Sequence, residues 1–256
     1  MKTYIIGDIH GCYHTFLELL FKIGISEGDS IICTGDLIDR GKFPFEVIDF
    51  FRNSDESLSR KLKISVTSVR GNHDDKYLRW LKGNNVKLSV KDGNFDDHYN
   101  FDFSTSNDLK KNIIEFFNSL CVIKHINPEI TVVHAGIFPW MNHKLLSESF
   151  DKNMKILMYI RHYRDGYSSK DNPKGYTNDK NMFFDETLPM WYDFYKKQDY
   201  GGTVFFGHQP EKEPIVVKGK TNIIGLDTSA VFGNKLTAYC IETDTFHFCN
   251  TINCDI

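Results

Sequence analysis

Three short apolar segments in the first 75 residues each run into glycine and into side chains that can bind a metal or a phosphate. The segments cover residues 3–6, 30–34 and 63–69, and the strings after them are GDIHG (7–11), GDLIDRG (35–41) and RGNHD (70–74). Short β-branched runs that stop at such turns predict buried strands. Residues 12–23, 45–52 and 75–81 have the spacing of helices. This alternation predicts a parallel sheet with its functional residues at the carboxyl ends of the strands.

The rest of the chain predicts a second group of strands. We expect a helix over 107–120, a short helix over 188–197, and a loop or irregular hairpin over 86–105. Strands are expected at 122–126, 130–134, 203–206, 214–217, 222–225, 236–241 and 245–249. With no linker or repeat, the order predicts a single α/β (α+β) domain over residues 1–256, a two-sheet β-sandwich flanked by helices. We expect residues 161–199, approximately, to form an exposed insertion that faces the substrate.

The composition excludes several other classes of protein. The 256 residues carry a net charge of −3, so we expect no stable nucleic-acid partner. No apolar run approaches the roughly 20 residues that a membrane-spanning helix needs, so no membrane contact is expected. Six cysteines without a CxxC pair, and an N-terminus without the pattern of a signal peptide, indicate reduced thiols. We therefore expect a soluble, cytoplasmic protein.

Six residues of the motifs are candidate metal ligands. Asp8 and His10 are two positions apart, and an extended backbone would place both side chains on one face, where they can bind the same ion. Asp36 follows the neighbouring strand and can bridge to a second ion. The motifs RGNHD, VHAGI (133–137) and FGHQP (206–210) complete the second site with Asn72, His134 and His208. These ligand types suit Mn, Fe, Zn or Mg.

Two ions that share a carboxylate, about 3.5–4 Å apart, are the usual arrangement for metal-assisted phosphoester hydrolysis. Two cations lower the pKa of the water between them, so a metal-bridging hydroxide can act as the nucleophile at neutral pH. The cations also remove the repulsion among clustered carboxylates. The six candidate ligands therefore predict two divalent metal ions and a hydrolase.

Three further residues of the motifs have roles that need no metal. His73 follows Asn72 and can protonate the leaving oxygen. Asp39 can hold the His73 imidazole by a hydrogen bond and favour its charged form. Arg40 offers a planar fork for phosphate oxygens. We predict His73 and Asp39 as the catalytic pair and Arg40 as a phosphate-binding residue.

The five strings resemble the motifs of the calcineurin-like metallophosphoesterases, in particular those of the phosphoprotein phosphatase superfamily. GDIHG, GDLIDRG and RGNHD are similar to the family's three signatures in order and spacing, and HAGI and GHQP to its later histidine motifs. The segment IIGLDTSAVFGNKLTAY (223–239) is similar to one found in bacterial members. The resemblance covers about residues 3–241 and implies the family's β-sandwich fold and the residue roles given above. It also implies a second phosphate-binding arginine before GHQP, with Arg161 as the first candidate and Arg164 as the second.

The resemblance leaves the substrate open. It implies first a Ser/Thr protein phosphatase-like phosphomonoesterase that acts on phosphorylated proteins with Mn²⁺, or with Fe, Zn, Ni or Mg. GNHD, where protein phosphatases of the eukaryotic type usually have GNHE, is similar to the diadenosine-tetraphosphatase-like branch. That similarity implies a bis(5'-nucleosyl)-tetraphosphatase-like hydrolase of dinucleoside polyphosphates or nucleotide ends. GDLIDRG, however, keeps the Asp39–Arg40 pair that some members of this branch alter. A non-catalytic binding module with the same fold is the third hypothesis.

Each motif alone also has a structural interpretation. His134 can be a core histidine, and Asn72 can cap the helix that follows it. The joint occurrence of five motifs in order favours the functional interpretation. Asp227 can hold a metal-ligating histidine or form a turn. Three aromatic residues are expected to pack, with nucleobase stacking as the alternative: Trp140, Trp191 and Tyr192.

Overall fold

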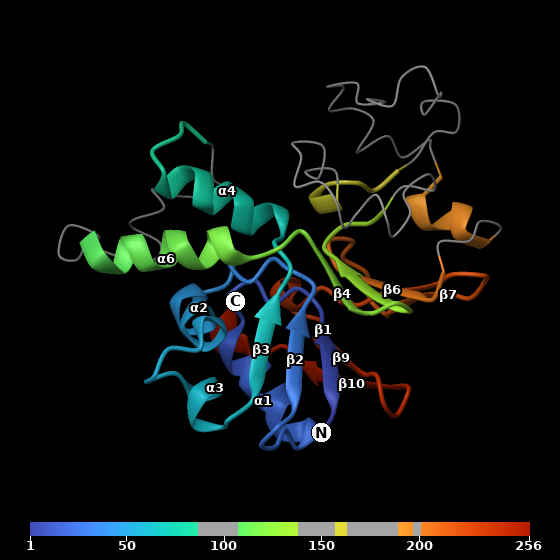
Figure 1. Cartoon of the computed structure of the whole chain (residues 1–256), viewed down its shortest axis with the longest axis horizontal. Helices are drawn as coiled ribbons and strands as arrows, with labels where there is room; N and C mark the ends of the chain where they lie inside the picture. Colours follow the sequence, from blue (N-terminus) through green and yellow to red (C-terminus); the bar gives the residue numbers. More distant parts are fainter. Residues whose placement is uncertain (87–106, 138–156, 163–188, 197–200) are drawn as a thin grey trace.

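The structure is a computed structural model that describes residues 1–86, 107–137, 157–162, 189–196 and 201–256. Its first sheet contains β1 (Thr3–Ile6), β2 (Ser30–Cys33), β3 (Ser65–Ser68), β9 (Lys235–Cys240) and β10 (Thr245–Asn250) in the order β10-β9-β1-β2-β3 (Figure 1). β1, β2 and β3 are parallel, whereas β9 runs antiparallel to β1 and β10. The carboxyl ends of β1, β2 and β3 therefore lie at one edge of the sheet, as predicted.

The second sheet is also mixed. It contains β4 (Ile123–Asn127), β5 (Ile130–Val133), β6 (Thr203–Phe206), β7 (Ile215–Val217) and β8 (Asn222–Gly225) in the order β4-β5-β6-β8-β7. β5, β6 and β8 are parallel, and the two edge strands are antiparallel to their neighbours. The loops after β5, β6 and β8 thus leave this sheet at a common edge.

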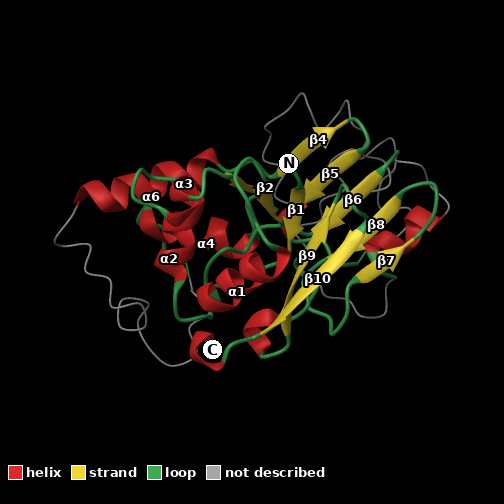
Figure 2. Cartoon of the chain, turned by 90° about the horizontal axis from the view of Figure 1, so that it is seen from below, coloured by secondary structure: helices red, strands yellow, loops and turns green. Residues whose placement is uncertain are grey.

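The side chains of each strand alternate between two layers of core. Ile5 of β1 packs between the sheets, together with Ile32, Phe205 and Ile224. The next residue, Ile6, packs on the other face with the helices that cover the first sheet (Figure 2). These helices are α1 (Tyr13–Ile23), α2 (Pro44–Arg52), α4 (Asn72–Leu81) and α6 (Asn107–Ser119). The 3₁₀ helix η4 (Trp191–Lys196) covers the outer face of the second sheet. The predicted fold class, a β-sandwich flanked by helices, is confirmed.

The structure differs from the prediction at short elements and helix ends. α4 begins at Asn72 rather than at residue 75, because the carboxylate of Asp74 accepts a hydrogen bond from Gly71 N at its N-terminus. Three elements of three or four residues, α3 (Leu58–Lys61), η5 (Ala230–Phe232) and η6 (Asn253–Asp255), are too short to produce a periodic pattern. The predicted loop at 86–105 and most of the insertion at 161–199 lie outside the described residues. Within the described part of the chain, no helix combines the length and the apolarity of a membrane span.

Candidate metal centre

The predicted ligands meet where the carboxyl ends of the two sheets come together. Loops after β1, β2 and β3 carry Asp8, His10, Asp36 and Asn72, and loops after β5 and β6 carry His134 and His208. Five of these side chains have no more than 8% of their surface exposed: Asp8, His10, Asp36, His134 and His208. A hydrogen bond of 2.8 Å from His208 N to Asp8 Oδ2 joins loops that are 200 residues apart. The two sheets therefore build one buried polar centre.

The backbone of these loops is unusual. The angle φ is positive at His10 (48°), Asp36 (51°), Asp39 (76°), Arg40 (79°) and His208 (63°). Residues other than glycine rarely adopt this left-handed conformation, and when they do they cluster at functional sites. The positive φ at His10 also means that the argument from an extended backbone does not apply to Asp8 and His10. Their placement depends instead on hydrogen bonds between loops, such as that from His10 N to Asp36 O.

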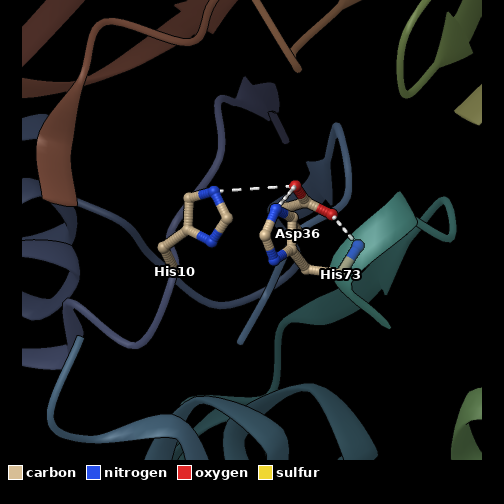
Figure 3. Close-up of side chains that lie close together, drawn as sticks. All are labelled: His10, Asp36 and His73. Atoms are coloured by element: carbon tan, nitrogen blue, oxygen red, sulfur yellow. Dashed lines mark hydrogen bonds and ion pairs between the residues drawn. The ribbon is translucent and has the colours of Figure 1, made fainter. Parts of the chain in front are cut away.

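Asp36 lies between two groups of possible ligands. In the first group, Asp36 Oδ2 is 3.5 Å from His10 Nε2 and 3.9 Å from His73 Nε2 (Figure 3). His10 Nδ1 lies 2.9 Å from the carbonyl oxygen of Ile38, which can only accept a hydrogen bond. Nδ1 therefore carries the proton, and Nε2 presents its lone pair to the centre, as metal-binding histidines do.

The second group shares the same carboxylate. Asp36 Oδ2 is 3.4 Å from His134 Nε2, and Asn72 Oδ1 is 2.9 Å from both His134 Nε2 and His208 Nδ1. The donor atoms of Asp36, His134 and His208 all lie within 4.8 Å of one another, as do those of Asp36, His10 and His73. A carboxylate common to both groups is placed as a bridging ligand would be.

The hydrogen bonds around His134 provide a test of whether a cation fits here. His134 Nδ1 lies 2.9 Å from the carbonyl oxygen of Thr34, so Nε2 faces the oxygens of Asn72 and Asp36. Burial lowers the pKa of His134, but the charges of Asp36 and Asp8 outweigh burial and raise it to about 9. At neutral pH Nε2 therefore carries a second proton. That proton removes the repulsion between the lone pair of Nε2 and those of the Asn72 and Asp36 oxygens. A divalent ion would relieve it in the same way, and the nitrogen and oxygen donors suit Mn, Fe or Zn.

Asp8 is held by two hydrogen bonds at the edge of the centre. Its Oδ1 accepts from Thr34 Oγ1 at 2.9 Å, and its Oδ2 accepts from His208 N. Burial and the charge of Asp227 raise the pKa of Asp8 well above its usual range. A cation would stabilise such a buried carboxylate. Asp227 itself accepts from Ser229 N at 3.1 Å, which supports the turn role for that residue.

The pKa values of three other candidate ligands, Asp36, His10 and His208, are all lowered, and this sets their charges at neutral pH. Burial would raise the pKa of Asp36, but His134 and His73 hold it well below its usual range. Burial lowers the pKa of His10 to about 4 and lowers that of His208 well below its usual value. At neutral pH Asp36 is therefore an anion, and His10 and His208 are neutral. These are the protonation states in which the three side chains bind a metal.

Asp39, His73 and Arg40 form a chain of contacts beside the candidate metal ligands. His73 Nδ1 donates to Asp39 Oδ2 at 2.5 Å, which leaves Nε2 directed to the centre. The Arg40 guanidinium lies 3.2 Å from His73 Nε2 and 3.4 Å from His10 Nε2. Burial raises the pKa of Asp39, but the hydrogen bond and charge of His73 bring it below its usual value. Asp39 is therefore an anion that accepts the hydrogen bond of His73 Nδ1.

Two glycines allow these loops to approach one another. A Cβ at Gly71 would overlap the side chain of Asp36, and a Cβ at Gly207 would overlap that of Asp8. Side chains larger than glycine would therefore displace a ligand at either position.

Arg161 lies next to the second group of ligands. Its Nε donates to His208 Nε2 at 3.3 Å, and its guanidinium donates to the carbonyl oxygen of His208 at 3.0 Å. Burial lowers the pKa of Arg161, while the charge of Asp227 opposes that effect. Arg161 therefore contacts a ligand candidate of the second group, whereas Arg40 contacts His10 and His73 of the first. Arg164, the second candidate, lies outside the described residues.

Asp74 has a role that the motifs alone did not predict. Its carboxylate accepts from Gly71 N and Asp36 N at 2.9 Å and from Leu37 N at 3.0 Å. It thus joins the loops after β2 and β3. Burial and the charge of Asp36 raise its pKa to about 7. The position of an acidic residue in the first turn of a helix is a signal that could have identified it.

Residues 1–212 match the family model described as "Calcineurin-like phosphoesterase". The chain is 32% identical over 253 residues to a relative from Bacillus subtilis (strain 168) named bis(5'-nucleosyl)-tetraphosphatase PrpE [asymmetrical]. The match covers 92% of this chain and 88% of the relative.

Solved structures with the same arrangement of elements include enzymes of two kinds. One, provisionally assigned as a diadenosine tetraphosphatase, has a TM-score of 0.66 at 22% identity and covers 98% of this chain and 94% of its own. Another is a protein serine/threonine phosphatase from Saccharomyces cerevisiae, with a TM-score of 0.55 at 16% identity and coverage of 93% and 72%. At these identities the two structures support the fold.

Proposed function

Because the chain belongs to the calcineurin-like phosphoesterase family and is a phosphoester hydrolase, we propose that it hydrolyses dinucleoside tetraphosphates in the asymmetrical manner. The supporting observation is the relative from B. subtilis, which bears that activity in its name and matches this chain over nearly its whole length. Asymmetrical cleavage of such a substrate gives one nucleoside monophosphate and one nucleoside triphosphate. This reverses the order of the two substrate hypotheses drawn from the motifs.

The family depends on two metal ions, and the donor groups around Asp36 fit that requirement. We assign Asp8, His10 and Asp36 to one ion and Asp36, Asn72, His134 and His208 to the other, with Mn²⁺ as the expected metal. When bound by these residues, two such cations would supply a lower pKa for water and would neutralise charge on the phosphate. Because every expected ligand type is present, we do not favour a non-catalytic binding module.

The other residues supply binding and a proton. Arg40 contacts the first group of donors and Arg161 contacts the second, so both can hold oxygens of a phosphate bound at the centre. Arg40 donates to His73 Nε2, so this nitrogen is within reach of any group that Arg40 binds. A phosphate that takes over these hydrogen bonds frees Nε2 to carry a proton. The anionic Asp39 at Nδ1 stabilises the resulting imidazolium, which can protonate the leaving oxygen.

A comparison of two substrates with Mn²⁺ tests the proposal. We expect kcat/KM for diadenosine tetraphosphate to exceed that for a phosphoserine peptide by at least about 10-fold, with equal amounts of AMP and ATP as products. His73→Asn should lower kcat for the phosphoserine peptide by about 10²- to 10⁴-fold, the usual contribution of general acid catalysis, and should lower kcat for diadenosine tetraphosphate by less, because a polyphosphate is a better leaving group than an alkoxide. His247→Ala, on β10 beside Thr245, is the matched histidine control and should retain full activity. Equal formation of two ADP molecules would contradict asymmetrical cleavage.

A phosphomonoesterase is the second candidate, and the Asp39–Arg40–His73 chain favours it because a leaving alkoxide needs the proton that His73 would supply. A higher kcat/KM for the phosphoserine peptide in the same experiment would establish this activity and displace the first proposal. Full activity of Asp36→Ala under strict control of metals would contradict the mechanism for both substrates.

A further inference from the structure

An exposed aromatic ring stands beside the candidate centre. Phe232 lies in η5, which follows β8, and 62% of its surface is exposed. Its ring centroid is 5.1 Å from Cζ of Arg40, within the range of a cation–π contact. A single exposed apolar side chain is ordinary, so it is the contact with Arg40 that links this ring to the centre.

Arg40 connects this ring to the metal ligands. The guanidinium lies within 3.4 Å of His10 Nε2 and within 3.2 Å of His73 Nε2, and it contacts the ring of Phe232 as well. The Arg40 side chain therefore lies between the Phe232 ring and the Nε2 atoms of His10 and His73. A phosphate held by Arg40 would have its attached nucleoside within reach of the ring.

The turn that carries Phe232 is fixed by hydrogen bonds. Phe232 N donates to the carbonyl oxygen of Ser229, and Thr251 Oγ1 donates to that of Ala230 at 2.6 Å. The Asn234 side chain donates to the carbonyl oxygens of Thr228 and Lys212. An exposed ring on such a turn is pre-organised, so a ligand that stacks on it loses little additional entropy.

We propose that Phe232 binds a nucleobase of the substrate by stacking, with Arg40 on the same ring and on the phosphate. The proposal rests on the assignment of dinucleoside polyphosphates as substrates. The recognised base is that of the nucleoside joined directly to the phosphoryl group in the centre. A planar purine stacks on a phenylalanine ring without regard to its hydrogen-bonding edge, so Phe232 selects nucleotides over other phosphate esters without reading the base.

The aromatic residues considered from sequence occupy other places. Trp191 has 1% of its surface exposed and packs against Phe206 with ring centroids 5.1 Å apart, so it belongs to the core. Tyr192 also lies against Phe206, at 5.7 Å. Trp140 lies outside the described residues. Phe21 is also an exposed phenylalanine, and it provides a matched control. It lies on α1, close to β1, because Tyr4 OH of β1 donates to the carbonyl oxygen of Ile23 at the end of the same helix.

The first experiment compares two substrates of the Mn²⁺-loaded enzyme, diadenosine tetraphosphate and β-glycerophosphate, which has no ring. Phe232→Ala should raise KM for diadenosine tetraphosphate by about 5- to 150-fold, the contribution of one stacked base. It should leave kcat/KM for β-glycerophosphate within about 2-fold. Phe232→Trp should restore the low KM, and Phe21→Ala should change neither substrate. Equal losses on both substrates would mean that the ring only supports Arg40, and would overturn the proposal, as would no loss on either.

The second experiment separates this proposal from the proposed function. Equilibrium binding of AMP and of ribose 5-phosphate to the Mn²⁺-loaded protein requires no turnover. The wild type should bind AMP about 5- to 150-fold more tightly than ribose 5-phosphate, and Phe232→Ala should bind both equally. A wild type that prefers AMP but does not cleave diadenosine tetraphosphate would contradict the substrate and leave base stacking supported. An AMP preference that is unchanged in Phe232→Ala would overturn the stacking role even where the enzyme cleaves the dinucleotide.

Discussion

Asp74 shows how a single buried carboxylate can set the geometry of several ligands. It accepts hydrogen bonds from the backbone of Asp36, Leu37 and Gly71, so it holds both the proposed bridging carboxylate and the loop that ends in Asn72. A backbone N–H that loses its buried acceptor costs about 1–3 kcal/mol. Asp74 therefore acts on the centre through the positions of its neighbours rather than by contact with a substrate.

We expect Asp74→Asn to lower both stability and activity. An amide has one acceptor oxygen and presents N–H groups to backbone donors, so at least one of the three hydrogen bonds is lost. The expected cost is about 1–3 kcal/mol in the free energy of unfolding, measured with urea, together with a lower kcat. Asp75→Asn is the matched control, because Asp75 pairs with Arg79 at 3.0 Å on α4. Unchanged kcat in Asp74→Asn would show that the loops hold their places without this carboxylate.

Asp29 provides a pH-dependent contribution to stability away from the metal ligands. Its carboxylate accepts from Lys2 N at 2.7 Å and from Ser26 N at 3.0 Å. Burial raises its pKa, but these hydrogen bonds outweigh burial and bring it below the usual value. Because the folded pKa is depressed, the contribution is fully present above the unfolded pKa of about 3.9. It is lost as the pH falls through the folded pKa.

We therefore expect Asp29→Asn to destabilise the protein by roughly 1–3 kcal/mol at pH 7, and expect the difference from wild type to shrink below about pH 4. Urea unfolding of both proteins from pH 7 to pH 3, with chelator throughout, measures the difference at a constant metal state. A difference that stays constant over this range would refute the depressed pKa.

At the scale of elements, α1 depends on a cap from the far end of the chain. Its N-cap residue, Cys12, makes no side-chain cap hydrogen bond. The carboxylate of Asp255 in η6 accepts from His14 N at 3.2 Å and from Thr15 N at 2.7 Å, and also from the Thr15 hydroxyl at 2.6 Å. These are the donors that a local cap would normally satisfy. α1 starts directly after the loop of Asp8 and His10, so the cap also supports the centre.

Asp255→Ala should therefore cost about 1–2 kcal/mol in the free energy of unfolding, the usual contribution of an N-cap. It should also speed hydrogen exchange in the first turn of α1. Glu18→Ala on the same helix is the matched control, since Glu18 forms an exposed ion pair with Lys22. If exchange in the first turn stays as slow as in the wild type, another group must satisfy these N–H donors.

At the scale of the whole molecule, the sequence was informative about what each loop carries and less so about how the loops fit. Strand-terminal motifs predicted which side chains lie together at the centre, because parallel strands bring their carboxyl ends to one edge. The left-handed backbone at His10 could not be predicted, since it depends on hydrogen bonds to the loop of Asp36. The cap by Asp255 and the place of Phe232 beside Arg40 are contacts between distant segments with no local pattern. The assignment of residues 1–256 to one domain stays a prediction.

The two sheets meet at Asp36, so the metal ions should stabilise the whole fold. A ligand that binds only the folded state at 100 times its Kd adds about 2.7 kcal/mol to the free energy of unfolding. For a protein of this size that corresponds to a rise in Tm of roughly 5–10 °C. We expect Mn²⁺ to raise the Tm of chelator-treated wild type by at least this amount in differential scanning calorimetry. Asp36→Ala, which loses the carboxylate shared by both donor groups, should show little of that rise, whereas His247→Ala should show all of it. An equal rise in wild type and Asp36→Ala would place the bound Mn²⁺ elsewhere in the protein.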